Sequence, residues 1–193
     1  MLFPTHLVVA VGLGVGSRLR AASSAVPART SQPPLSVGWL VVGAALPDVI
    51  DKPLGLAGVT ELYHSVGHSA LGLLVAVVVA LASQRGVGVA GRRGLSLAVG
   101  WGSHLFLDAL HVVVNGRPSD ALFLGWPAVL PPDPPAIPPG EFVWYYLGSP
   151  SSFLEVLLWL VVVALVVGWL RVDAAATGVA GDTADSDAER RTN

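Results

Sequence analysis

Two histidines and an aspartate lie inside a long apolar run, and this feature constrains the fold more than any other. Residues 95–114 are hydrophobic enough to cross a bilayer, yet they contain His104, Asp108 and His111. On a helix this spacing of i, i+4 and i+7 places the three side chains on one face. Ionisable groups in a membrane helix usually face a bundle interior and mark a functional site. The alternative is that the histidines only link helices and that the aspartate caps a turn.

The composition indicates a membrane protein. Of the 193 residues, 53% are hydrophobic and 12% are charged, whereas a soluble domain carries roughly 25% charged residues. The chain has no cysteine, which excludes disulfides and thiolate metal ligands. A net charge of -2 without a basic stripe argues against nucleic acid as a partner. The preference for arginine over lysine, with many Ala, Val and Gly, is typical of a prokaryote with a GC-rich genome.

Five apolar runs predict an all-α, polytopic bundle of about five transmembrane helices in the lipid bilayer. The runs are residues 2–16, 35–46, 69–82, 95–114 and 153–170. The first lacks the basic start of a signal peptide, and the second is short for a span and ends at Pro47. We predict one membrane-embedded domain, residues 1–172, followed by a disordered acidic tail, residues 173–193, because the tail is small and polar.

A proline-dense segment separates the last two runs. Residues 131–135 contain four prolines and one aspartate. Proline at this density breaks helices and favours extended chain. We therefore expect residues 115–152 to form a Pro-rich, non-cytoplasmic loop. Its apolar part, residues 121–130, either lies along the membrane interface or folds back over the bundle. The aromatic residues 144–146 are typical of an interfacial anchor, and Glu155 is expected to be an interfacial or capping acid.

The basic residues predict the orientation of the chain. If the N-terminus is outside, nine of the eleven basic residues lie on the cytoplasmic side, and only Lys52 and Arg117 lie outside. The positive-inside rule favours this arrangement. We predict a multi-pass protein of the inner, or plasma, membrane with its N-terminus outside and its C-terminus in the cytoplasm.

This orientation brings eight polar side chains to a similar depth on the non-cytoplasmic side. They are His6, Asp48, Asp51, His64, His68, His104, Asp108 and His111. Because the orientation was inferred from arginine and lysine alone, the convergence independently supports a site at this end of the helices.

Histidine and carboxylate groups without thiolates suit zinc, and also manganese or iron. One catalytic ion usually takes three protein ligands, so eight candidates suffice for one or two ions. A two-metal site activates water and clamps both oxygens in ester or phosphoester hydrolysis. The spacing of Asp48 and Asp51 allows them to flank an ion pair. The chain lacks a Gly-x-Ser-x-Gly motif, which argues against a serine hydrolase.

Four short motifs resemble one family. They are Thr5-His6, Pro47-Asp48-x-x-Asp51, Gly67-His68-Ser69 and Gly102-Ser103-His104-x-x-x-Asp108. Together they resemble the YdjM-type membrane-bound metal-dependent hydrolases, a family also described as LexA-binding and inner-membrane-associated. The resemblance covers roughly residues 1–115 by motif. It implies metal-site positions at His6, Asp48, Asp51, His68, His104 and Asp108. The chain departs from the commoner Arg-Gly-x-Thr-His-Ser form at residues 64–69, and no part of it is typical of a repressor-binding module.

We predict a hydrolase whose outward-facing metal site acts on a small-molecule or lipid ester or phosphoester. The predicted metal ligands are His6, Asp48, Asp51, His68, His104, Asp108 and His111. Asp51 and His64 are the predicted catalytic residues, because a carboxylate or imidazole beside the metal can serve as general base or acid. One alternative is a divalent-cation or proton transporter, disfavoured by apolar cytoplasmic halves and the absence of a repeat. Another is a non-catalytic protein whose helices a metal holds together.

Overall fold

The computed structural model describes residues 2–23, 34–60, 64–84, 89–130 and 141–192, and all regular structure within them is helical. This confirms the all-α prediction. The elements are α1 (Phe3–Ala22), α2 (Val37–Leu56), α3 (Ala70–Gln84), α4 (Val89–Val114), the 3-10 helix η1 (Pro118–Gly125), α5 (Phe142–Leu147) and α6 (Pro150–Thr192).

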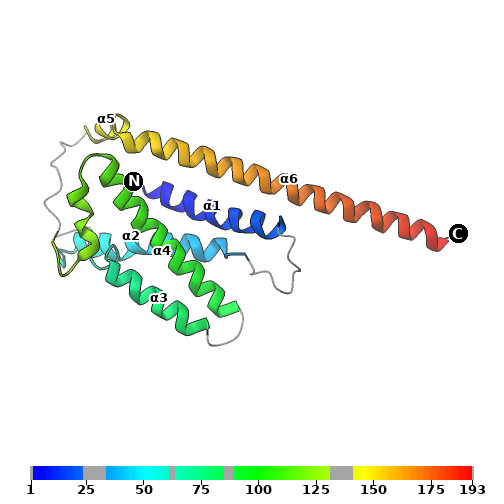
Figure 1. The fold of residues 1–193 in the computed structure, drawn as a ribbon, viewed down its shortest axis with the longest axis horizontal. Coiled ribbons are helices and arrows are strands. Elements are labelled where there is room, and N and C mark those ends of the chain that lie inside the picture. Colours follow the sequence, from blue (N-terminus) through cyan, green and yellow to red (C-terminus); the bar gives the residue numbers. More distant parts are fainter. Residues whose placement is uncertain (1, 24–33, 61–63, 85–88, 131–140, 193) are drawn as a thin grey trace.

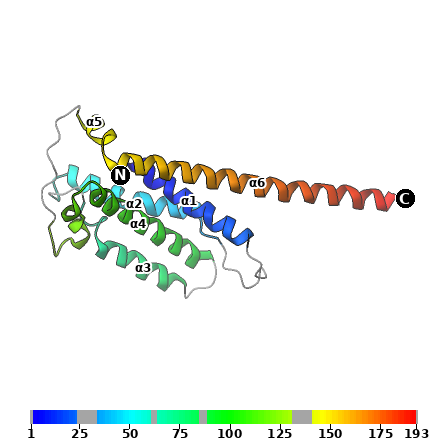
Figure 2. The ribbon, with the colours of Figure 1, turned by 45° about the horizontal axis from the view of Figure 1, so that its top comes forward.

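The long helices alternate in direction, so that two opposite ends of the bundle are defined (Figure 1). The first turns of α1, α3 and α6 meet the last turns of α2 and α4 at one end, where η1 also lies; we call it the η1 end. Helix α4 packs against both α2 and α3, and α6 runs along α1 and extends far past the other helices. The turned view shows the same neighbours (Figure 2).

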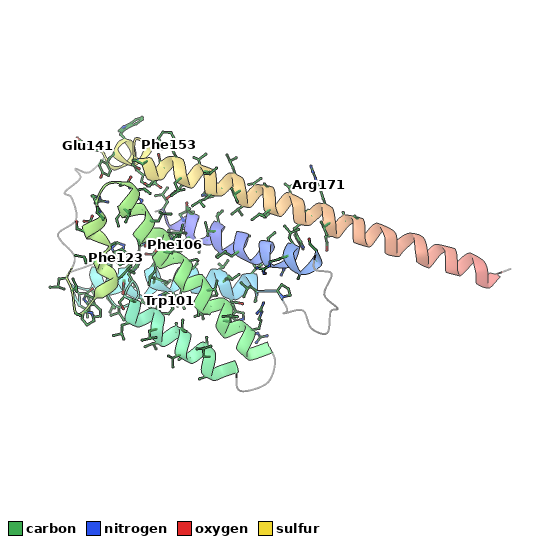
Figure 3. The ribbon with its side chains drawn as sticks, in the orientation of Figure 1. Trp101, Phe106, Phe123, Glu141, Phe153 and Arg171 are labelled. Atoms are coloured by element: carbon green, nitrogen blue, oxygen red, sulfur yellow. The ribbon has the colours of Figure 1, made fainter. Side chains whose placement is uncertain are left out.

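Among the described residues, two helical segments are long and apolar enough to cross a membrane. They are Gly91–Val114 in α4 and Pro150–Ala175 in α6, and the shorter Ala70–Ala82 in α3 is also apolar. Five spans are therefore not confirmed. Helix α2 differs because its second half carries Asp48, Asp51 and Lys52. On α6, Phe153 and Arg171 project away from the bundle (Figure 3), and Phe153 is 73% exposed.

Helix α2 extends beyond its predicted end. The sequence predicted that it stops at Leu46, but it continues through Pro47 and Pro53 to Leu56. A proline inside a helix removes one backbone hydrogen bond, and here Pro47 is buried at the crossing with Gly67. An ion pair of 2.9 Å between Lys52 Nζ and Asp48 Oδ2 supports the turn after Pro47. As a result, the two aspartates project from a helix and not from a loop.

Helices α2 and α4 touch backbone to backbone because each has a glycine at the crossing. A Cβ atom on Gly43 would overlap the carbonyl oxygen of Leu97, and one on Gly100 would overlap that of Leu40. Small residues allow this close approach of helices in membrane proteins. The contact places the carbonyl oxygens of α2 within reach of side chains on α4.

The remaining predictions concern the ends of elements. Within the apolar part of the predicted loop, η1 folds back onto α3 and α4 and buries Phe123, while the proline-dense residues 131–140 lie outside the described residues. Helix α6 continues to Thr192, where a disordered tail from residue 173 was predicted; this stretch is rich in alanine, the strongest helix former. The division into a domain and a tail stays a prediction.

Candidate metal centre

Five side chains from four parts of the chain meet at the η1 end. They are His6 from α1, Asp48 from α2, His68 from the α2–α3 connection, and His104 and Asp108 from α4. The three imidazoles are at most 2% exposed. One donor atom from each of His6, His104 and Asp108 lies within 4.8 Å of the others, and the same holds for Asp48, His68 and His104. The cluster therefore offers overlapping sets of metal-competent donors.

Asp108 lies at the centre of the cluster. Its Oδ1 is 3.1 Å from His6 Nε2, and its Oδ2 is 3.2 Å from His104 Nε2 and 3.4 Å from His68 Nε2. Asp48 Oδ1 lies 3.7 Å from His68 Nε2. Donors bound tetrahedrally at the usual zinc–nitrogen distance are about 3.3 Å apart. The spacing of these donors is thus already close to that of a coordination shell.

Two of the imidazole rings are oriented by partners behind them. His104 Nδ1 lies 2.6 Å from the carbonyl oxygen of Ala44, and because a carbonyl only accepts, this nitrogen must donate its hydrogen. His68 Nδ1 lies 2.8 Å from Asp51 Oδ2 and donates likewise. In neutral rings both Nε2 atoms then carry lone pairs, and these atoms are 3.2 Å apart. Such an arrangement, beside the Asp108 carboxylate, favours a cation between the donors.

The structure places Asp51, a predicted ligand and catalytic residue, behind His68. Its side chain is fully buried and its two oxygens accept five hydrogen bonds. The donors are Ser65 N, Ser65 Oγ, Gly67 N, His68 N and His68 Nδ1. None of the candidate metal-binding groups found among the described residues contains Asp51. Its contacts are those of a carboxylate that orients a ligating histidine.

The connection that carries His68 is also fixed from α4. Trp101 Nε1 donates to the carbonyl oxygen of Gly67 at 2.8 Å, and Trp101 lies where α4 faces α3 (Figure 3). A Cβ atom on Gly67 would lie 2.7 Å from the carbonyl oxygen of Pro47. His68 is therefore held by backbone, side chain and steric contacts together.

The other two predicted histidines lie at the edge of the cluster. His64 is exposed, and its ring centroid is 4.4 Å from that of His68 and 5.4 Å from that of Phe123. It can join His68 and Asp108 as a third donor. His111 lies further along α4, with its ring centroid 6.3 Å from that of Tyr146, and it is not in any donor group among the described residues.

The cluster contains more acidic side chains than lysine or arginine side chains. Three carboxylates, those of Asp48, Asp51 and Asp108, surround His68, whereas Lys52 is the basic side chain paired with Asp48 and is 53% exposed. Burial alone would lower the pKa of His68, but hydrogen bonds and charge from Asp108 and Asp51 outweigh it and raise the pKa above the ordinary value. The surroundings of His68 thus favour positive charge.

His6 is positioned from the last helix, a contact that the sequence did not reveal. Glu155 of α6 is buried and accepts from Leu2 N at 2.7 Å and from Thr5 Oγ1 at 2.9 Å. Trp159 Nε1 donates to the same Thr5 oxygen at 3.0 Å. The expected capping acid therefore caps α1 and not its own helix. Since Thr5 precedes His6, α6 fixes the turn from which His6 projects.

Two further supporting groups were missed from the sequence for different reasons. The carbonyl of Ala44 belongs to the backbone and gives no side-chain signal. Ser65 had a weak signal, its position between two histidines, but serine is common in loops.

Burial and the neighbouring Glu155 carboxylate raise the pKa of Tyr146, so that its phenol stays protonated beside the first turn of α6.

Comparison with protein families identifies the chain. A family model described as YdjM inner membrane protein matches residues 1–180, and the chain therefore belongs to that family. This confirms the resemblance seen in the motifs and the assignment to a membrane. Comparison with curated proteins and with solved structures finds no match.

Proposed function

We propose that this member of the YdjM inner membrane protein family is a metal-dependent hydrolase of an ester or phosphoester. The observation that carries the proposal is the pair of Nε2 atoms of His68 and His104. They lie 3.2 Å apart beside Asp108, with both rings turned toward each other by hydrogen bonds from behind. A ligand set prepared in this way is typical of metal centres in proteins.

The donor set fits a divalent ion. Three imidazoles with carboxylates and no thiolate favour zinc, with manganese or iron as the next candidates, and the donors suffice for one or two ions. The proposed ligands are His6, Asp48, His68, His104 and Asp108. A bound ion of this kind would lower the pKa of a coordinated water toward neutrality and polarise the bond to be cleaved.

The remaining polar groups would support the reaction without binding metal. Asp51 holds His68 in the orientation that ligation needs. His64 lies at the exposed rim next to His68, where it can exchange protons with water and act as general acid or base. His111, outside the donor groups, is not required as a ligand in this proposal. Asp48 and Asp108 keep slight exposure of their side chains, 12% and 10%, so substrate would approach from the His64 side.

The position of the cluster argues against a transporter. All of its members lie at the η1 end, and the buried residues next to them where α1 and α2 meet, Ala10, Leu40 and Ala44, are apolar. A pathway for ions or protons would need polar groups in place of this apolar layer. The second candidate function is structural. The five donors come from four parts of the chain, so a bound metal would also hold the helices together.

The first experiment is to measure the metal content of the detergent-purified protein and of three variants. We expect about one or two ions per chain in the wild type. His104→Ala and Asp108→Ala should each lose most of the bound metal, because each removes a central donor. His111→Ala is the matched control on the same helix and should keep its metal. Circular dichroism would verify that each variant is still helical.

The results of this experiment distinguish a catalytic metal from a structural one. Metal bound by the wild type together with turnover of a phosphoester or carboxyl ester, lost in His104→Ala, supports the hydrolase. Metal bound without turnover on either class supports the structural reading. A protein that holds no metal, even after zinc or manganese is added, contradicts both.

A further inference from the structure

A large cavity runs along α1 from Val9 to Ala21 and reaches the end of the bundle opposite the metal centre. Its volume is about 890 Å³, and it lies between α1, α4 and α6. Apolar side chains form most of its wall, among them Val99 of α4 and Val162 of α6, and Gly16 lies on the α1 side. Arg20, near the end of α1, and Arg92, near the start of α4, line it as well. The cavity is thus apolar with a cationic edge.

This end of the bundle has a strong excess of positive charge. Arg18 and Arg93 lie close to the two lining arginines in sequence, residues 2–47 and 64–107 contain no aspartate or glutamate, and on α6 the acidic Asp173 follows Arg171. No acidic side chain lines the cavity in the part of the chain that the structure describes. The Nε atom of Arg92 donates to the neutral carbonyl of Pro34 at 3.3 Å. Guanidinium groups bind phosphate through several donors at once, so an anion is the complementary ligand.

We propose that the cavity binds an anionic phospholipid. The phosphate would lie between Arg20 and Arg92, and an acyl chain would occupy the apolar space along α1 and α6. Basic pockets between membrane helices favour anionic head groups, and the family to which the chain belongs resides in the inner membrane. Because Arg20 and Arg92 lie at the end opposite the metal centre, the phosphate of the lipid would be far from the metal site, and the lipid is a resident ligand and not the substrate.

Gly16 provides space for the acyl chain. Gly16 lines the cavity, and a Cβ atom placed on it would have no other atom within 4 Å. By contrast, a Cβ atom on the neighbouring lining residue Gly12 would lie 2.6 Å from Val162. A large side chain at position 16 would therefore fill the cavity without forcing the helices apart.

Native mass spectrometry of the full-length protein in detergent tests the proposal with two lipids of identical acyl chains, phosphatidylglycerol and phosphatidylcholine. We expect the wild type to retain phosphatidylglycerol. Each arginine near an anionic head group contributes enough to change affinity about five-fold, so Arg20→Gln with Arg92→Gln should weaken binding about 25-fold. Arg93 is exposed and lies outside the cavity wall. Arg93→Gln is therefore the matched control and should bind phosphatidylglycerol as the wild type does.

A steric variant tests the same site with its charges intact. Gly16→Leu should lose phosphatidylglycerol and keep its metal content. Gly38→Leu is the control, since Gly38 is exposed, lies outside the cavity wall and has nothing within 4 Å of its Cβ position. Phosphatidylglycerol should raise the melting temperature of the wild type and of both controls, because a ligand stabilises the state that binds it, but not that of Gly16→Leu.

Three results would overturn the proposal. The first is equal binding of phosphatidylcholine and phosphatidylglycerol by the wild type. The second is binding by Gly16→Leu at the wild-type level, which remains informative even if the double arginine variant folds poorly. The third is a loss in Arg93→Gln as large as in the double variant, because diffuse attraction and not this cavity would then hold the lipid.

Discussion

At the scale of the residue, His68 and His104 are oriented by different kinds of partner. His104 donates to a neutral carbonyl, whereas His68 donates to the carboxylate of Asp51. A carboxylate partner raises the basicity of a ligating imidazole more than a carbonyl does, because it stabilises positive charge on the ring. Asp51 is therefore the residue behind the donors whose removal should change the centre most.

Asp51→Asn should weaken metal binding about 10- to 100-fold and lower the free energy of unfolding by about 2 kcal/mol. All five partners of Asp51 donate hydrogen bonds, but an amide has a single accepting oxygen, and its NH₂ group would face donors. Competition with a chelator measures the affinity, and thermal unfolding measures the stability. The control is Asp120→Asn, which removes an ion pair of 3.0 Å with Arg117 outside the cluster. Unchanged metal affinity in Asp51→Asn would contradict a supporting role.

At the scale of the element, the contact between α2 and α4 makes the His104 hydrogen bond possible. The glycines at positions 43 and 100 let the two backbones meet, and one turn further along α4 the ring of His104 reaches the carbonyl of Ala44. Larger residues at the crossing would hold the helices apart and leave the ring without this partner. The tautomer of His104 therefore depends on residues that do not touch it.

Gly100→Ala should destabilise the protein by about 1–3 kcal/mol, the usual effect of adding volume to a packed site, and should also weaken metal binding. The added Cβ atom overlaps the carbonyl oxygen of Leu40, so α2 and α4 must move apart. Unfolding temperature and metal content are the two measurements. Gly38→Ala adds the same atom where nothing lies within 4 Å and should have little effect on either. A Gly100→Ala protein with wild-type stability would show that the helices do not meet as described.

At the scale of the whole molecule, the alternating helices place two unlike sites at opposite ends. The metal centre is at the η1 end, and the two arginines that line the cavity are at the other. The positive-inside rule predicts that the arginine-rich connections lie in the cytoplasm, an orientation that would expose the metal centre to the non-cytoplasmic side. Contacts between α1 and α6, with Glu155 at the first turn of α1, join the beginning of the chain to its last helix.

The predicted orientation can be measured with single cysteines, because the chain has none of its own. Val59→Cys lies just after α2 at the η1 end, where the native side chain is 68% exposed. An impermeant maleimide should label it in spheroplasts without permeabilisation. Arg93→Cys, exposed near the start of α4, should react only after permeabilisation. The reverse pattern would place the metal centre in the cytoplasm.

The sequence by itself determined the helical class, the membrane family and five side chains that meet in the cluster, those of His6, Asp48, His68, His104 and Asp108. These follow from local properties, namely hydrophobicity and the helical spacing of His104 and Asp108. It placed the end of α2 wrongly, because Pro47 is normally a helix breaker, and burial of Pro47 against Gly67 was not visible in the pattern.

Only the tertiary structure decided how the polar residues divide their roles. His104 and His111 share a helix and a residue type, yet one faces Asp108 and the other faces Tyr146. Asp48 and Asp51 are one turn apart, yet one lies beside the donors and the other lies behind His68. These differences depend on how each helix is rotated and on which backbone groups lie opposite. Such contacts join residues far apart in the chain, so no local pattern encodes them.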